Sequence, residues 1–349
     1  VATELVRVAI LWQETWHDSL EDASRQYFGE GNVQAMLDNL LAAHELMNLG
    51  PNTLKEMSFV KKYGQDLHDA YIALQNYKRV MEEAGRQVPE YGAAPVPARH
   101  QRKAPLSLEE GFLAQAWDLY YKVFKSINEQ ILSLTSLELQ YCSPLLSNAV
   151  DLDLGVPGTY HINGSCVRIK SFNQVVPLIR SKQHPRKIKL NGEDGNEYGF
   201  LLKGLEDLRQ DERAMQLFGL VNALFSSDNR TANEDFSIRR YSVIPLSPTA
   251  GLLSWVPRCD TLHDVIRDFR DSRKILLNIE VKLMQQMAPN QLYDQLSLMQ
   301  KLEVFEYALA NTAGEDVAKV LWHRSETSEI WLEKRNNYTR SLAVMSIVG

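Results

Sequence analysis

The stretch that decides the fold is residues 199–213, which read Gly-Phe-Leu-Leu-Lys-Gly-Leu-Glu-Asp-Leu-Arg-Gln-Asp-Glu-Arg. Its apolar part predicts a strand that ends on Lys203, and the acidic residues after it are typical of the first turn of a helix. A lysine at a strand end, facing a carboxylate on the next helix, can hold the phosphates of a nucleotide. Taken alone, the stretch is better explained as a solvated cation followed by ordinary acids at a helix start.

The segments around this stretch predict a sheet with one long helix. The sequences at residues 163–164 and 191–195 are hairpin signals, because Asn-Gly and Asp-Gly favour tight turns. The expected strands are residues 166–172, 175–180, 186–190, 198–203 and 241–246, and the expected helix is residues 208–225. After residue 257 the pattern becomes helical, with helices expected at residues 261–269, 296–311, 316–323 and 328–348.

The first third of the chain predicts a helical bundle. Apolar residues recur at helical spacing in the first two helices: Trp12, Trp16, Leu20, Ala23 and Tyr27, then Val33, Leu37, Leu40, His44 and Met47. Capping boxes at residues 53–56 and 107–110 open the third and fourth helices. Residues 88–106 contain four prolines and few large apolar side chains, so we expect an extended insertion there.

Length and composition exclude several classes of protein. The 349 residues are enough for two or three domains, and a net charge of −6 with mixed signs gives no basic surface for nucleic acid. Cys142, Cys166 and Cys259 have no metal-ligand spacing, which fits inert thiols in a reducing compartment. No apolar stretch is long enough to span a membrane. The chain begins without a methionine or a signal peptide, so we expect Val1 to be an internal position.

Further stretches carry a family resemblance. Residues 240–246, 251–257 and 337–346, together with 203–211, resemble the small lobe, hinge and first part of the large lobe of phosphatidylinositol-3-kinase-related protein kinases. Residues 21–29 and 116–124 resemble the rapamycin-binding helical domain found in the target-of-rapamycin (TOR) kinases of that family. Both halves occur in the order that these kinases have them.

The resemblance implies an α+β fold in three parts. Residues 1–131 would be a rapamycin-binding four-helix bundle, with the insertion at 88–106. Residues 132–257 would be a kinase small lobe of antiparallel sheet and long helix, ending in the hinge, and residues 258–349 the start of the large lobe. The implied activity is ATP-dependent phosphorylation of serine and threonine in proteins, in the control of cell growth by nutrients.

The nucleotide site that the resemblance implies centres on Lys203, which would contact the ATP phosphates. Our first choice for its ion-pair partner is Asp211, and the second is Glu206. The adenine slot would be formed by Leu201, Tyr241, Trp255 and the backbone of Val256. Residues 171–177 occupy the place of a phosphate-binding loop, yet they contain no glycine and otherwise predict a hairpin.

Two parts of a kinase site are missing from the sequence. Neither Asp-Arg-His nor Asp-Phe-Gly, the catalytic and metal motifs of the family, occurs in the 349 residues. We therefore assign no catalytic residue and no metal ligand, and expect the Mg²⁺ ligands to lie beyond Gly349. The 349 residues alone are expected to be inactive.

The bundle offers a second site through the resemblance. An aromatic cleft for rapamycin with its immunophilin, and for protein substrates, would be formed by Leu20, Ser24, Phe28, Trp117, Asp118, Tyr121 and Phe124. Without the resemblance, Phe28, Trp117 and Phe124 are better explained as bundle core. His44 lies on an apolar helix face and is expected to be a satisfied core or rim histidine.

Two alternatives remain open at the level of sequence. The chain could act only as a docking module attached to an incomplete lobe, or it could come from a related lipid kinase, which the bundle argues against. The further partners implied by the resemblance are the scaffold and β-propeller subunits of TOR complexes. The implied location is the cytoplasm, with peripheral attachment to the vacuolar or lysosomal membrane.

Overall fold

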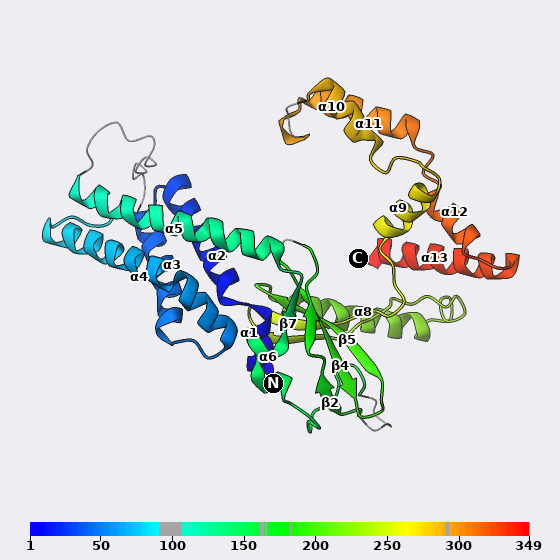
Figure 1. Ribbon diagram of the computed structural model, residues 1–349. Coiled ribbons are helices and arrows are strands. Elements are labelled where there is room, and N and C mark those ends of the chain that lie inside the picture. The colour runs from blue at the N-terminus through cyan, green and yellow to red at the C-terminus, as the bar shows by residue number, and fades with distance from the viewer. Residues whose placement is uncertain (91–106, 161–163, 165, 182, 290–292, 349) are drawn as a thin grey trace. The chain divides into compact units, whose positions relative to one another are not determined.

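The computed structural model describes residues 1–90, 107–160, 164, 166–181, 183–289 and 293–348 (Figure 1). The chain forms two compact units. The first comprises Val1–Met215 and Tyr241–Trp255, and the second comprises Gln216–Arg240 and Val256–Gly349. The first unit contains both the helical bundle and the sheet, whereas residues 216–240, which were predicted as part of the small lobe, belong to the second unit.

The bundle has the predicted helices, and both predicted capping boxes are confirmed. The side chains of Thr53 and Ser107 accept hydrogen bonds from the backbone amides of Glu56 and Glu110. Each glutamate carboxylate in turn accepts from the backbone amide of the cap residue. The core between the helices is apolar, with Trp16, Leu40 and Ile127 fully buried. The elements are α2 (Trp12–Ser24), the π-helix η1 (Arg25–Gly29), α3 (Val33–Asn48), α4 (Leu54–Glu83) and α5 (Leu108–Ser133).

The predicted insertion is described only at its beginning. The carbonyl of Pro89 accepts hydrogen bonds from the amides of Val33 and Gln34, at 3.0 and 3.1 Å. These amides belong to the first turn of α3, where a helix has no internal acceptors for them. The rest of the insertion, residues 91–106, lies outside the described residues.

The described part of the sheet has five antiparallel strands in the order β2-β4-β5-β7-β6. The strands are β2 (Ile169–Phe172), β4 (Arg186–Gly192), β5 (Glu197–Gly204), β6 (Val243–Ser247) and β7 (Ala250–Ser254). The strand β7 was not predicted, because Gly251 within it weakens the pattern. The hairpin signal at 191–195 is confirmed as the β4–β5 turn, whereas the signal at 163–164 falls partly outside the described residues.

The hairpin alternative for residues 171–177 is wrong. The strand β3 (Val175–Pro177) does not pair with β2 but with β1 (Ser136–Glu138), in a separate two-stranded sheet. The short helices α6 (Leu139–Cys142) and α7 (Pro144–Ser147) follow β1. Neither β1 nor these two helices was predicted, since three or four residues are too few for a periodic signal.

The helix α1 (Ala2–Ala9) belongs to the sheet rather than to the bundle. Leu5, Val8 and Ala9 are buried in the same apolar core as Ile188 of β4 and Leu202 of β5. The bundle proper therefore starts at α2, and the predicted domain 1–131 includes a helix that packs beneath the sheet.

The second unit is mainly helical. The helix α8 (Arg209–Ser227) begins in the first unit and continues into the second. The others are α9 (Leu262–Ser272), α10 (Ile279–Met287), which was not predicted, α11 (Leu298–Asn311), α12 (Asp316–His323) and α13 (Ser328–Val348). Arg270 of α9 bonds Asp316 of α12 at 2.6 Å, which ties these two helices together. Among the described residues, no helix has the length and apolarity to cross a membrane.

Candidate functional site

The two sides of the sheet differ in chemistry. Along β4 and β5 buried residues alternate with half-exposed ones, so one side faces the apolar core and the other is open. The open side carries Lys187, Lys189, Leu201 and Lys203. Lys187 lies opposite Leu201 and Lys203 lies opposite Gly251 in the strand register, so the ends of three strands meet on this side.

Lys203 forms an ion pair with Glu206, with 2.7 Å between Nζ and Oε2. Both side chains are about one-third exposed, which leaves the ammonium accessible to an anion. The pairing that we ranked first is wrong: Asp211 lies exposed on α8, and in the described structure the lysine bonds the nearer acid. The backbone can turn back toward the lysine within three residues because Leu205, which lies between Lys203 and Glu206, adopts a positive φ of 61°.

The turn after Lys203 is held against α1. A Cβ on Gly204 would overlap the carbonyl oxygen of Ala9, so a glycine is required where helix and strand touch. At the end of this turn, just before α8, the Asp207 carboxylate accepts hydrogen bonds from the guanidinium and the backbone amide of Arg209, and these bonds lower its pKa to about 2. The first residue of α8 is thereby bonded to the turn that follows the lysine.

The four residues expected to hold adenine are divided between the two units. Leu201, Tyr241 and Trp255 lie in the first unit and Val256 in the second. Trp255 is 37% exposed, and its amide donates to the Gly199 carbonyl at 2.9 Å. A Cβ on Gly199 would lie 3.2 Å from the Trp255 Cβ, so the absence of a side chain there leaves space for the indole.

The segment expected at the place of a phosphate loop forms a short connection between β2 and β3. Asn173 donates to Glu197 at 3.0 Å, and Gln174 donates to the Ser147 carbonyl at 3.0 Å. The side-chain amides of both residues are therefore engaged in structural contacts.

The predicted docking residues separate into a surface group and one core residue. Phe28 is 48% exposed and packs on Trp117, with ring centroids 5.0 Å apart, and Trp117 stacks on buried Tyr27 at 5.5 Å. Asp118 and Tyr121 are exposed, and Ser24 and Phe124 are half-buried. Leu20 is buried in the bundle core, so it cannot contact a ligand without a rearrangement.

Two histidines lie near these aromatic residues. The prediction for His44 is confirmed: it is buried and hydrogen-bonded to the Tyr120 hydroxyl at 2.9 Å, and burial lowers its pKa to about 4. His17 stacks on Phe124 at 4.8 Å. Its ring nitrogen and the carboxylates of Asp18 and Glu21 lie within 4.8 Å of one another, a spacing that could hold a cation. Exposed carboxylates group in this way in many proteins without one.

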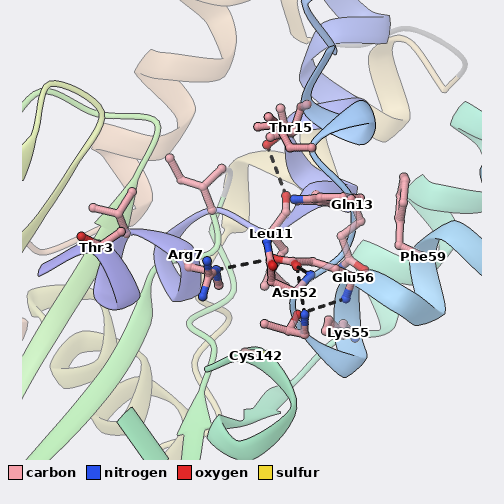
Figure 2. Close-up of a pocket in the computed structure, with 17 residues that line it drawn as sticks. Thr3, Arg7, Leu11, Gln13, Thr15, Asn52, Lys55, Glu56, Phe59 and Cys142 are labelled. Atoms are coloured by element: carbon pink, nitrogen blue, oxygen red, sulfur yellow. Dashed lines mark hydrogen bonds and ion pairs between the residues drawn. The ribbon is translucent and has the colours of Figure 1, made fainter. Parts of the chain in front are cut away.

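A cavity of about 300 Å³ lies away from both predicted sites (Figure 2). It is lined by α1, the start of α2, the α3–α4 turn and Cys142 of α6. Arg7 points across it toward Glu56, at 3.6 Å, and Glu56 accepts from the amides of Asn52 and Thr53 (Figure 2). Burial raises the pKa of the Cys142 thiol to about 11, so this cysteine is a poor nucleophile.

A buried ion pair that the sequence did not predict joins the bundle to the sheet. Arg186 of β4 is 1% exposed and bonds the carboxylate of Glu14 on α2. Glu14 also accepts from the Leu11 amide at 2.9 Å, and Arg186 donates to the His184 carbonyl at 2.8 Å. The two residues are 172 positions apart, so no local pattern could have indicated the pair. The one available signal was an arginine at a core-facing strand position.

Comparison with known families gives one match for the helical bundle and another for the part that contains most of the sheet and the helices after it. Residues 4–129 match the FKBP12-rapamycin binding domain, and residues 197–349 match phosphatidylinositol 3- and 4-kinase. The chain is 51% identical to serine/threonine-protein kinase TOR of Arabidopsis thaliana and 48% identical to serine/threonine-protein kinase TOR2 of Saccharomyces cerevisiae, over its full length in each case. It is 49% identical over 99% of its length to serine/threonine-protein kinase mTor of Drosophila melanogaster.

The chain spans 13% of the length of each of these relatives. Both family matches occur in the order predicted from the sequence, and the matched residues include the aromatic surface and the Lys203–Glu206 pair. The chain belongs to the target-of-rapamycin family of serine/threonine kinases.

Proposed function

We propose that the full-length protein is an ATP-dependent serine/threonine protein kinase of the TOR type, acting in the control of cell growth by nutrients. The observation that supports this most is the Lys203–Glu206 ion pair on the open side of the sheet, on the strand whose Gly199 carbonyl accepts from the Trp255 amide. A positioned ammonium at the end of β5 and an aromatic ring farther along the same strand suit a ligand with phosphates at one end and a flat base at the other.

The residues present fit ATP at this position. Lys203 would contact the phosphates, and Glu206 would hold the ammonium in place while leaving part of it exposed. Leu201, Tyr241, Trp255 and the Val256 backbone would hold the adenine. When bound, ATP supplies the transferred phosphoryl group, and Mg²⁺ would neutralise its charge through ligands beyond Gly349.

Peptide phosphorylation by the full-length protein tests this function. The Lys203→Ala variant should lose activity while remaining folded, because the phosphates lose their cation, and Lys189→Ala removes a lysine from the same side as a matched control. Activity of Lys203→Ala within a few-fold of wild type would remove the assignment. The 349-residue chain itself should transfer no phosphate, and labelled phosphate appearing in a peptide with this purified chain would contradict that expectation.

The bundle supports a second role as a docking module. We infer that its aromatic surface binds rapamycin with its immunophilin and recruits protein substrates, since Phe28 is half-exposed on a rigid stack of rings. Scaffold and β-propeller subunits of TOR complexes are proposed as further partners. The relatives named above are protein kinases, which favours a protein over a lipid as the substrate.

We also propose that the full-length protein is cytoplasmic, with peripheral attachment to the vacuolar or lysosomal membrane. Fractionation of cells that express the tagged protein tests this location. Recovery only in nuclei or in the secretory pathway would contradict it.

A further inference from the structure

The side chain of Lys187 lies against the ring of Trp255. Its Nζ is 3.9 Å from the centroid of the indole, a close cation–π contact. The sheet register explains how the two meet: Lys187 lies opposite Leu201 on the open side, and the Trp255 amide bonds the carbonyl of Gly199 two residues earlier on the same strand. Because Gly199 has no side chain, the indole can extend toward β4.

The other lysines of the open side are occupied differently. Lys189 bonds Glu197 at 2.7 Å and Lys203 bonds Glu206 at 2.7 Å. Within the described residues, Lys187 has no carboxylate at ion-pair distance, and the indole is the group that its ammonium contacts. Among the lysines that the structure describes in this sheet, Lys187 is the one whose ammonium contacts an aromatic ring.

We propose that Lys187 is a positioning residue for the nucleotide base, acting through Trp255. The inference rests on the proposed function, because it assumes that a base stacks beside Trp255. The ammonium would hold the indole in one orientation at the edge of the open side, so that less freedom is lost when a base binds. Lys187 would then affect the affinity for the base, while Lys203 holds the phosphates.

The test compares Lys187→Met with wild type in the full-length protein, using peptide phosphorylation. Methionine keeps an unbranched apolar stem and removes the charge. The KM for ATP should rise about 2- to 30-fold with kcat unchanged, the range that the loss of a cation–π contact gives. Lys187→Arg should keep most of the wild-type affinity, because a guanidinium over the indole also makes a cation–π contact.

Adenosine as an inhibitor distinguishes a role at the base from a role at the phosphates. Since adenosine has no phosphate, its inhibition constant should rise by the same factor as the KM for ATP. An unchanged inhibition constant for adenosine with a raised KM for ATP would overturn the proposal and indicate direct contact with phosphate. The matched control is Lys189→Met, on the same side two residues along, which should change neither constant.

A double-variant cycle with Trp255→Leu tests the route of action. Lys187→Met should have little further effect once the indole is gone, because the ammonium then has no ring to hold. An equal effect with and without the indole would overturn the proposal. Failure of the proposed function has a different signature: wild type itself would neither phosphorylate peptide nor be inhibited by adenosine.

Discussion

Substitution of Glu14 by glutamine tests the buried connection between the bundle and the sheet. Arg186 is almost completely buried, and its charge is compensated by the Glu14 carboxylate. Glutamine has the same size and can still accept the hydrogen bond of the Leu11 amide, but it carries no charge. The variant therefore leaves a guanidinium in the interior without a counter-charge.

The expected cost is large because removing one partner of a buried pair usually costs about 3–5 kcal/mol. We expect the lower end, about 3 kcal/mol, because the amide oxygen of glutamine can still accept from the guanidinium. The Nε of Arg186 already has no hydrogen-bond partner among the described residues, so few groups near the guanidinium could replace the carboxylate. Combining Glu14→Gln with Arg186→Met removes the stranded charge, so the double variant should lose less than the single one.

Hydrogen exchange of peptides from β4 measures the effect in the 349-residue chain. A loss of about 3 kcal/mol corresponds to exchange faster by about 100-fold in the regime set by opening free energy. The control is Lys189→Gln, which breaks a largely exposed pair and should change exchange by less than about 5-fold. Exchange in Glu14→Gln that stays within the range of this control would refute the structural role of the pair.

Four further predictions concern the bundle and the turn beside the candidate site. Burial lowers the pKa of His44 from its ordinary 6.5 to about 4. As the pH falls from 6.5 to 4, the unfolded chain therefore takes up a proton before the folded one, and about 3 kcal/mol of the free energy of unfolding should be lost. His44→Gln should remove this contribution to the pH dependence of acid denaturation. Ser24→Ile should weaken binding of rapamycin with its immunophilin by several kcal/mol through steric exclusion, with little change in the melting temperature. An affinity equal to that of wild type in calorimetry would contradict a binding cleft at Ser24. Trp117→Ala should also lose the drug, by removing the largest apolar contact surface. Gly204→Ala must displace the Ala9 carbonyl, so it should cost about 1–3 kcal/mol in thermal denaturation, and an unchanged melting temperature would contradict the close contact.

Local signals in the sequence predicted local structure well. The capping boxes at Thr53 and Ser107 place both partners within three residues of each other, and both helices begin where the boxes predict. The partner of Lys203 was harder to predict, because two acids lay within reach of the strand end. The positive φ of Leu205 decides in favour of Glu206, and an ordinary leucine gives no signal for that conformation.

Features that depend on distant segments could not be predicted from the sequence. The contact of Lys187 with Trp255 requires the strand register, and the contact of Ala9 with Gly204 requires the position of α1 beneath the sheet. Leu20 was expected at the docking surface because the family resemblance covers its helix, yet its side chain points into the core. A resemblance identifies the helix, while burial decides which of its side chains a ligand can reach.

The most direct test of the proposed nucleotide site is labelling of the full-length protein with an acyl phosphate of ATP, which acylates a lysine beside the bound phosphates. Mass spectrometry of the digested protein should find Lys203 acylated, and an excess of ATP should prevent that modification. Lys189, which is paired with Glu197 on the same side of the sheet, should show no such protection. Acylation of Lys203 that excess ATP leaves unchanged, or protection at other lysines alone, would contradict a phosphate site at the Lys203–Glu206 pair.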